Sequence, residues 1–282
     1  MKQLIPFGIL LCFILVTANF EYSEAQIPRE RVQTDEPVSD IFWASSVIGV
    51  STVRNLSAGN LNSTIAHIFG PLRGGIDRFF GLDDGANTRL GLDYGFTDRF
   101  SLGIGRMTFN KIVDFRGKYN ILRQSTSGDI PFDLAIKFSS GISTLSGVGL
   151  EFSDRISYLV SVLAAKKFDR FSLQLTPMAA HFNNISPGNQ NQLFGIGILS
   201  QYELNERFSI STEYLPVLGK RYTGTHNALG AALNINTGGH IFQIFFTSSQ
   251  WHGEQFMMAN NRDRFFEGDF RFGFNIHRVF GL

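Results

Sequence analysis

A strict alternation of apolar and polar side chains over residues 87–110 limits the possible folds of this chain more than any other feature. Leu90 and Leu92 lie on one face of this pattern, Arg89 and Asp93 lie on the other, and the pattern starts again after a polar turn. A period of two with one apolar face predicts two β-strands joined by a turn. Each strand would have about 11 residues, which is the length that a tilted strand needs to cross the hydrocarbon of a bilayer.

One turn recurs along the chain at a spacing of about 36 residues or twice that value. Residues 98–102, 169–173 and 206–210 each contain an acid, an arginine, a phenylalanine, a serine and an apolar residue, in that order. We expect the acid and the arginine to form the turn and the phenylalanine to begin the next strand. Short turns that alternate with mostly longer loops are typical of outer-membrane barrels, and an even number of strands returns both ends to the periplasmic side. The predicted strands lie near residues 60–70, 87–97, 99–110, 113–125, 131–142, 152–168, 171–183, 192–204, 207–217, 226–237, 240–250 and 268–278.

Composition helps to separate the two folds that such hairpins can build. The chain contains 29 phenylalanines and only 17% charged residues, against a usual charged share of about 25%. A soluble β-sandwich would bury the phenylalanine face and show the same alternation. The phenylalanine content, and a last strand that reaches residue 280, favour a barrel with this face against lipid. We therefore predict an all-β, transmembrane, antiparallel up-and-down barrel of about 12 strands over residues 59–282.

The first 25 residues have the pattern of a secretory signal peptide. A basic start is followed by an apolar run over residues 4–16, and small residues permit cleavage after Ala25. The run is too short to span a bilayer as a helix, and an uncleaved anchor is the alternative. The only cysteine, Cys12, lies in this segment, so the exported chain would have no disulfide and no cysteine metal site.

Residues 26–58 precede the first predicted strand. The first part, 27–40, is polar and contains two prolines, which predicts a periplasmic linker. The second part, 41–55, is apolar and rich in serine. It could form a lead-in strand, a plug in the lumen or a periplasmic helix. A lead-in or plug is favoured, because one more barrel strand would make the count odd.

Charged residues recur on the strand faces that lie opposite the phenylalanines, so we expect them to line the lumen. They are Arg89, Asp93, Asp114, Arg116, Lys118, Asp133, Lys137, Glu213 and Arg271. Two interpretations are open: the charges line a water-filled pore, or they pair across the interior and close it. Mixed signs favour a narrow or plugged lumen. The net charge of +1 gives no basic field for a nucleic-acid partner.

A second repeat, Asp-Arg-Phe-Phe, occurs at residues 77–80 and 263–266, in the two longest predicted loops. These loops should emerge side by side if the first strand pairs with the last. We expect the two loops to pack together as a partial lid, with phenylalanine against phenylalanine and arginine against aspartate. The residues of the expected lid are Asp77, Arg78, Phe79, Phe80, Asp263, Arg264, Phe265 and Phe266. Acidic residues cluster in the same loops without the spacing of a calcium site, so neither a metal nor a cofactor is predicted.

Several short motifs of this chain occur in the order known from one family. They lie at residues 40–42, 59–61, 67–70, 75–77, 79–84 (FFGLDD), 89–95 (RLGLDYG), 103–106 and 118–124 (KYNILRQ). The chain resembles an uncharacterised family of outer-membrane β-barrel proteins from Bacteroidota, known as domain of unknown function 5777. The resemblance covers residue 40 to the end. It implies a barrel in the bacterial outer membrane, and it implies no catalytic residues.

The sequence thus predicts a non-enzymatic barrel whose surroundings are outer-membrane lipid. Its role would be that of a porin-like pore for a small solute, or of a structural and binding platform with unknown protein partners. The alternative is an interfacial lipid-acting enzyme, which would need a serine and a histidine near the lipid interface. Ser63 and Ser140, with His67 and His181, are the candidates for that pair.

Overall fold

A computed structural model describes residues 35–146 and 149–281 of the chain. The predicted signal peptide, residues 1–25, lies outside these ranges. Within them, no helix combines the length and the apolar character that a helical membrane span requires.

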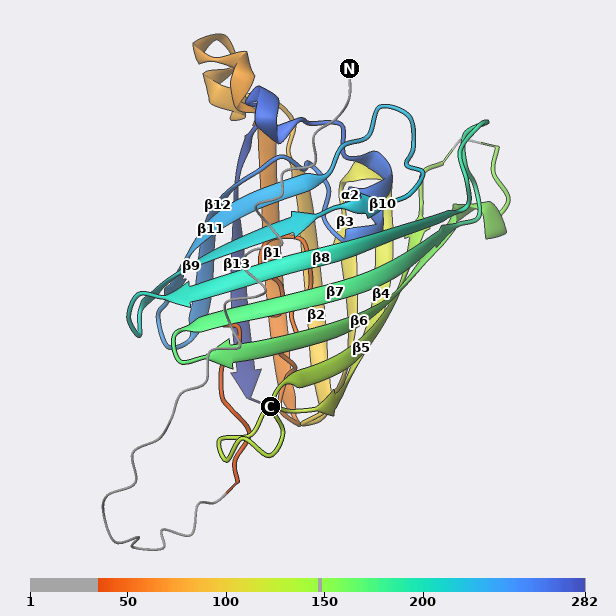
Figure 1. Ribbon diagram of the computed structural model, residues 1–282. Helices are drawn as coiled ribbons and strands as arrows, with labels where there is room; N and C mark the ends of the chain where they lie inside the picture. The colour runs from red at the N-terminus through yellow and green to blue at the C-terminus, as the bar shows by residue number, and fades with distance from the viewer. Residues whose placement is uncertain (1–34, 147–148, 282) are drawn as a thin grey trace, which may run out of the picture. The chain divides into compact units, whose positions relative to one another are not determined.

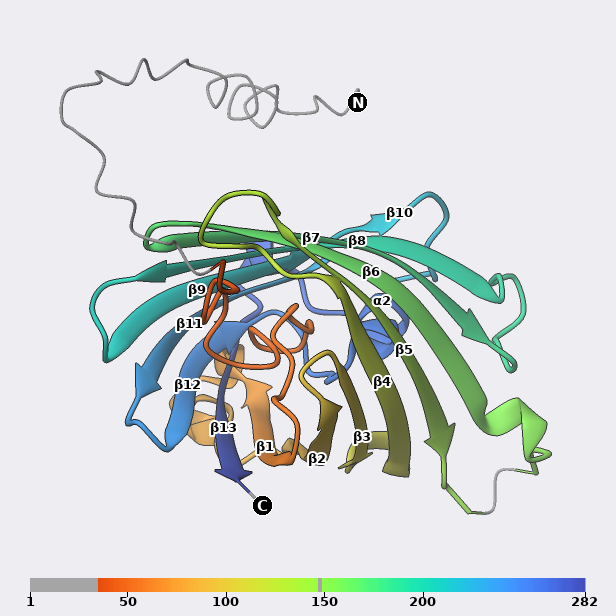
Figure 2. The same cartoon turned by 90° about the horizontal axis from the view of Figure 1, so that it is seen from below.

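The described residues form a closed antiparallel barrel of twelve strands (Figures 1 and 2). β1 pairs with both β2 and β13, and β8 pairs with both β7 and β9, so the sheet closes on itself. β9 and β10 both pair with β8 and form one barrel strand, interrupted at Pro216. The strands are β1 (Asn60–Pro71), β2 (Asn87–Thr97), β3 (Phe100–Met107), β4 (Ile112–Leu122), β5 (Asp133–Ser143), β6 (Ile156–Phe168), β7 (Phe171–Phe182), β8 (Gln192–Glu203), β9 (Phe208–Leu215), β10 (Val217–Leu218), β11 (Ala228–Asn236), β12 (His240–Thr247) and β13 (Arg271–Gly281). The predicted fold is therefore confirmed.

The helical segments are short and lie in the connections. They are η2 (Leu72–Gly74), η3 (Ile76–Gly81), η4 (Phe109–Lys111), η5 (Ser153–Arg155), α2 (Glu254–Asn260) and η6 (Phe265–Glu267). All of them lie at the end of the barrel where β1 finishes, which we call the loop end. The opposite end, where β1 begins and β13 finishes, is the turn end (Figure 1).

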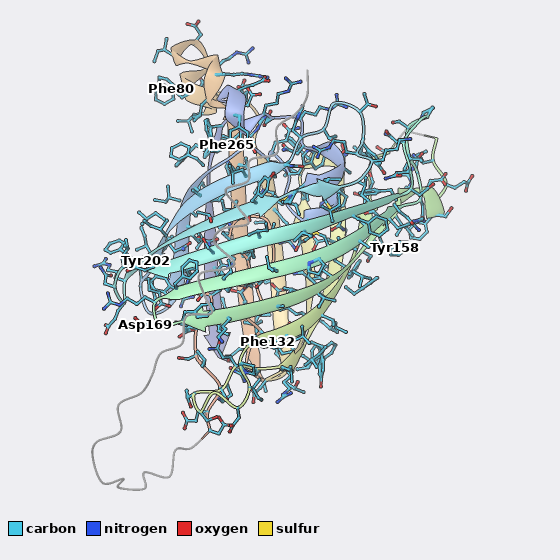
Figure 3. The ribbon with its side chains drawn as sticks, viewed as in Figure 1. Phe80, Phe132, Tyr158, Asp169, Tyr202 and Phe265 are labelled. Carbon is cyan, nitrogen blue, oxygen red and sulfur yellow. The ribbon has the colours of Figure 1, made fainter. Side chains whose placement is uncertain are left out.

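The predicted acid–arginine turns occur at the turn end. Asp169 and Arg170 alone join β6 to β7, and Asp169 has a φ of 53°. Aspartate tolerates this left-handed conformation better than most side chains, which explains why an acid occupies the position. Figure 3 shows Asp169 at this end of the wall.

The outer wall of the barrel is apolar. Exposed phenylalanine, leucine, isoleucine and valine side chains occur on most strands, and Leu90, Phe115 and Phe138 are each about half exposed. Figure 3 shows Phe132 and Tyr202 on this wall. Such a surface suits hydrocarbon, and a closed barrel leaves no strand edge without a hydrogen-bonding partner in lipid.

The hydrophobic core lies inside the barrel. Residues 41–56, which we call the plug, enter the lumen from the turn end before β1 begins, as Figure 2 shows. A tight turn at residues 46–51 reverses the plug, with the amide of Val47 bonded to the carbonyl of Val50. Val50 and Val53 have no exposed surface. The plug is irregular, and it forms neither a barrel strand nor a helix.

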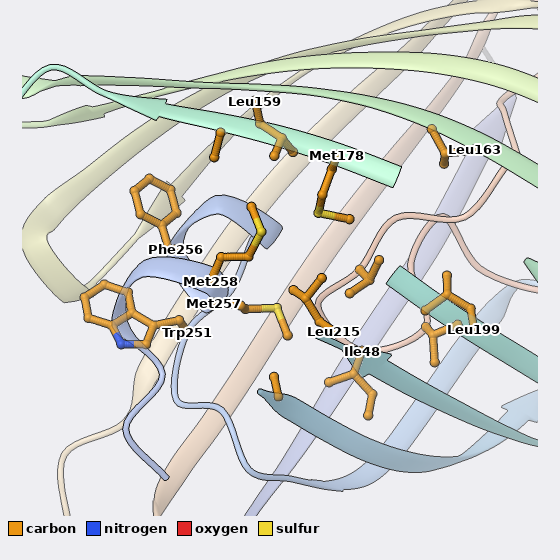
Figure 4. Packing of buried hydrophobic residues seen from close by; sticks show 14 of the residues in the cluster. Ile48, Leu159, Leu163, Met178, Leu199, Leu215, Trp251, Phe256, Met257 and Met258 are labelled. Atoms are coloured by element: carbon orange, nitrogen blue, oxygen red, sulfur yellow. The ribbon is translucent and has the colours of Figure 1, made fainter. Parts of the chain in front are cut away.

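A second segment enters the lumen from the loop end. α2 turns inward after β12, and its Met257 and Met258 are buried with Leu215 of β9 and Ile48 of the plug (Figure 4). Methionine suits such an irregular contact because its side chain is flexible. We expected the whole connection between the last two predicted strands, residues 251–267, to form an outer loop. The inward position of α2 corrects that expectation.

Candidate functional site

The candidate functional site is the filled lumen, and Glu213 holds the turn of the plug. Glu213 points inward from β9 and is 1% exposed. The amides of Ile48, Gly49 and Val50 each donate a hydrogen bond of 3.0 Å to its Oε2. Three amide donors stabilise a buried carboxylate that would otherwise be costly to remove from water. The absence of a side chain at Gly49 leaves room for Met257, because a Cβ there would lie 2.6 Å from its Sδ.

A buried ion pair connects the barrel wall, the plug and α2. Nζ of Lys137, on β5, lies 2.7 and 2.8 Å from the two carboxylate oxygens of Glu254. The same Nζ donates to Oγ of Ser51 at 2.7 Å, and the Ser51 amide donates to Glu254 at 2.9 Å. Both charged side chains are almost fully buried. The plug and α2 are therefore joined through one shared group of charges.

Carboxamide side chains of the wall bind the plug backbone. Gln174 accepts a 2.8 Å bond from the Val53 amide and donates a 2.8 Å bond to the Ser51 carbonyl. Asn120 donates to the Val53 carbonyl, and Asn275 donates to the Ile48 carbonyl, each at 3.0 Å. Irregular backbone at membrane depth is tolerated only where protein or water satisfies its polar groups, and here the wall does so.

Beside the plug, four charges form a paired cluster on β2 and β4. Arg89 makes two bonds to Asp114, at 2.7 and 2.9 Å, and Arg116 makes two bonds to Asp93, at 2.7 and 2.8 Å. Arg116 also bonds Asp114 at 2.7 Å. Such bidentate pairs are among the stronger protein hydrogen bonds. The cluster lines a central cavity of about 100 Å³.

Two glycines of β3, which lies between β2 and β4, make room for these charged side chains. A Cβ at Gly105 would lie 2.2 Å from Nη2 of Arg89, and a Cβ at Gly103 would lie 2.0 Å from a carboxylate oxygen of Asp93. Gly103 and Gly105 occupy inward positions of β3 because the charged side chains of β2 and β4 fill the space above them.

The other predicted lumen residues also face the interior. Lys118 donates to the Thr52 carbonyl of the plug at 2.9 Å. Asp133 is buried near the turn end, and Arg271 pairs with Asp263 near the loop end. Apart from Asp133, the predicted lumen charges pair between β2 and β4 or bond to the plug, to α2 or to Asp263.

The predicted lid has a different structure from the one expected. The two loops do lie side by side, because the Leu72 amide donates to the Phe270 carbonyl at 2.8 Å and Arg73 pairs with Asp269 at 2.8 Å. However, Arg78 of the first loop pairs with Asp84 of the same loop.

The second loop likewise uses partners close in sequence. Asp263 pairs with Arg271 at the start of β13, and Arg264 pairs with Glu267. The ring of Phe265 packs edge-to-face against Phe266 and Phe270.

The aromatic side chains do not join the two loops. Among the described residues, no ring of Phe79 or Phe80 stacks on Phe265 or Phe266, and Phe266 is 92% exposed. The expected aromatic contacts across the seam were therefore wrong, and Arg73 and Asp269 make the arginine–aspartate contact between the loops in place of the expected residues. Arg78, Asp263 and Arg264 instead pair with residues close in the sequence, at a smaller loss of conformational freedom.

The serine and histidine candidates for an enzyme are not joined by hydrogen bonds in the described ranges. Nδ1 of His67 lies 2.9 Å from the Thr88 hydroxyl. Ser140 and His181 lie on β5 and β7, with Tyr158 of β6 opposite both of them. Within residues 35–146 and 149–281 there is also no group of three potential metal ligands.

Sequence reasoning missed Glu254, Gln174 and Asn275 as plug-binding residues. Gln174 and Asn275 are uncharged polar residues at inward positions of strands. Inward carboxamides fit a water-filled channel and a plugged lumen equally well, so this pattern gave no signal for the plug. Glu254 also gave no signal, because it lies in a loop.

The fold and the filled lumen define a membrane-bound β-barrel protein. The sequence model of the family described as "membrane bound beta barrel domain (DUF5777)" matches residues 42–280. The chain therefore belongs to this family, which agrees with the resemblance seen in its sequence motifs. No curated protein sequence matches the chain.

Comparison with solved structures finds outer-membrane proteins among the matches. The NanC porin superposes with a TM-score of 0.51 at 12% identity, over 79% of this chain and 99% of the porin. The outer-membrane protein Omp33 of Acinetobacter baumannii has a TM-score of 0.44 at 9% identity, over 80% of this chain and 100% of Omp33. At such low identity, the similarity to the NanC porin shows the fold alone.

Proposed function

We propose that this protein is an outer-membrane barrel with a closed lumen that serves as a binding platform and has no catalytic role. One observation carries the proposal: the plug fills the lumen from the turn end and α2 fills it from the loop end, and Glu213 and Lys137 hold both in place. The apolar outer wall, the predicted signal peptide and the family support the outer membrane as the location. In this arrangement the loop end faces outward.

The contacts of the plug are strong enough to keep it in the lumen. Hydrogen bonds to charged groups contribute about 1.5–3 kcal/mol each, and neutral ones about 1 kcal/mol. Glu213 alone accepts three amide bonds. A docking free energy of only about 4 kcal/mol would leave the plug outside the lumen in about one molecule in a thousand. The closed state would therefore dominate.

Solute uptake by proteoliposomes tests this proposal. The refolded protein, reconstituted into liposomes, should admit arabinose no faster than empty liposomes do. A truncated chain that begins at Ser57 retains every barrel strand but lacks the plug. Once its refolding has been checked by circular dichroism, it should admit arabinose at least ten-fold faster. Uptake by the full chain well above the rate of empty liposomes would refute the closed lumen.

A gated passage for a small solute is the second candidate, and the arrangement of the cavities favours it. A cavity of about 250 Å³ at the turn end and the central cavity are both lined by Arg54 of the plug. The central cavity and a cavity of about 290 Å³ at the loop end are both lined by Phe256 of α2. Movement of the plug and α2 would join the three spaces into one path.

A further inference from the structure

The cavity at the loop end, which we call the cup, has the construction of a ligand site. It lies between the outer ends of β5, β6 and β7, the connections that follow β7 and β10, and the end of α2. Its volume of about 290 Å³ is close to the lower limit for small-molecule sites, which is about 300 Å³. If the loop end faces outward, the cup opens to the medium.

Aromatic rings form one side of the cup. Phe182 of β7 packs edge-on against Tyr222 and Phe256, with ring centroids 6.1 and 6.4 Å apart. The Tyr222 hydroxyl donates a 2.9 Å bond to the Gln190 carbonyl, which fixes that ring. A Cβ at Gly141 would lie 2.5 Å from Cζ of Phe256, so only glycine allows this ring to lie on β5. The aromatic surface is thus held rigidly by its surroundings.

Free carboxamide groups form much of the rim. Asn110, Asn184, Asn189 and Asn260 all line the cup. The side chains of these four residues make no hydrogen bond to other described residues, whereas the nearby Asn183 and Asn191 donate to backbone carbonyls at 2.7 Å. A carboxamide has two donors and an acceptor, which match the hydroxyl groups of a sugar.

The cup also contains two arginines that pair with no carboxylate in residues 35–146 and 149–281. Arg262 is exposed and makes no hydrogen bond or ion pair with the described residues. Among the residues that the structure describes, the guanidinium of Arg155 donates only to the backbone carbonyls of Leu145 and Leu150. Asp154 is the one acid among the described lining residues, so the cup has an excess of positive charge. Arginine is suited to bind a carboxylate with two parallel hydrogen bonds.

We propose that the cup binds an acidic saccharide, with sugar rings against the partly exposed Phe182 and Tyr222, hydroxyl groups on the free carboxamides and a carboxylate on Arg262. This inference rests on the proposed function, because it gives the binding platform a ligand class. Neither the aromatic wall nor the arginines alone would select this class. A neutral sugar leaves the arginines unpaired, and a simple anion leaves the rings and carboxamides unused.

Calorimetric titration of the refolded full chain in detergent tests the proposal, with trigalacturonic acid as the probe. We expect binding of trigalacturonic acid, and binding at least ten-fold weaker for neutral maltotriose and for inorganic phosphate. The variant R262Q should weaken the binding of trigalacturonic acid about ten-fold, which is the loss expected for one charge-assisted contact. Because Arg262 is exposed, the variant should fold. The matched control R207Q removes an exposed arginine at the turn end and should leave the binding unchanged.

Several outcomes would overturn this inference. They are the absence of binding, equal affinity for maltotriose or phosphate, and equal losses in R262Q and R207Q. None of them would affect the uptake result for the closed lumen, so failure of the cup and failure of the proposed function are distinguishable.

Discussion

Replacing Lys137 with alanine should lower the free energy of unfolding of the barrel by about 3–5 kcal/mol. The substitution leaves Glu254, which is 2% exposed, buried without its counter-charge. Removal of one partner of a buried pair costs far more than loss of the attraction, because the remaining charge is not solvated. Reversible guanidinium unfolding in lipid vesicles, followed by tryptophan fluorescence, would measure the change.

Two comparisons make this prediction specific. The variant Lys167→Ala breaks the pair with Glu203 at the turn end, where both side chains are partly exposed, and should cost about 1 kcal/mol or less. The double variant Lys137→Met with Glu254→Met removes both charges and should recover most of the lost stability. Equal losses for the two lysine variants would show that Lys137 and Glu254 do not form a buried pair.

Replacing Glu213 with alanine should make the plug leave the lumen about 100-fold more often. In the closed state, three plug amides would lose their acceptor in a buried position. At about 1–3 kcal/mol for each unsatisfied group, the loss is about 3 kcal/mol or more, and the amides regain hydrogen bonds in water. Arg54 of the plug should then be cleaved by trypsin about 100-fold faster, which corresponds to 3 kcal/mol of opening free energy.

The matched variant for this prediction is Glu213→Gln. A glutamine keeps one oxygen that can accept the plug amides, so cleavage at Arg54 should stay within about ten-fold of the wild-type rate. If Arg54 is as well protected in the alanine variant as in the wild type, Glu213 does not hold the plug.

The strands could be predicted from the sequence because their signals are local. Alternation and the acid–arginine turns placed both ends of β2, β7 and β8 within about one residue of their positions in the structure. β3 was predicted to reach residue 110 but ends at Met107, because η4 follows and Asn110 has a φ of 52°. The inward direction of the charges was predictable for the same reason, since side chains alternate along a strand.

The closure of the lumen could not be predicted in this way. The Val53–Gln174 bond joins residues 121 positions apart, and the Lys137–Glu254 pair joins residues 117 positions apart. No local pattern specifies these partners. The sequence of residues 41–55 left a lead-in strand, a plug and a helix open, with a lead-in or plug favoured. α2 is only seven residues long and follows a loop-like stretch. Its inward course depends on the space that the barrel leaves beside the plug.

Current through single molecules in planar lipid bilayers tests the closed lumen most directly. With the plug and α2 in place, the full chain should insert without stepwise conductance, and the chain that begins at Ser57 should give steps under the same conditions. A steady open current from the full chain, equal to that of the truncated chain, would contradict the account.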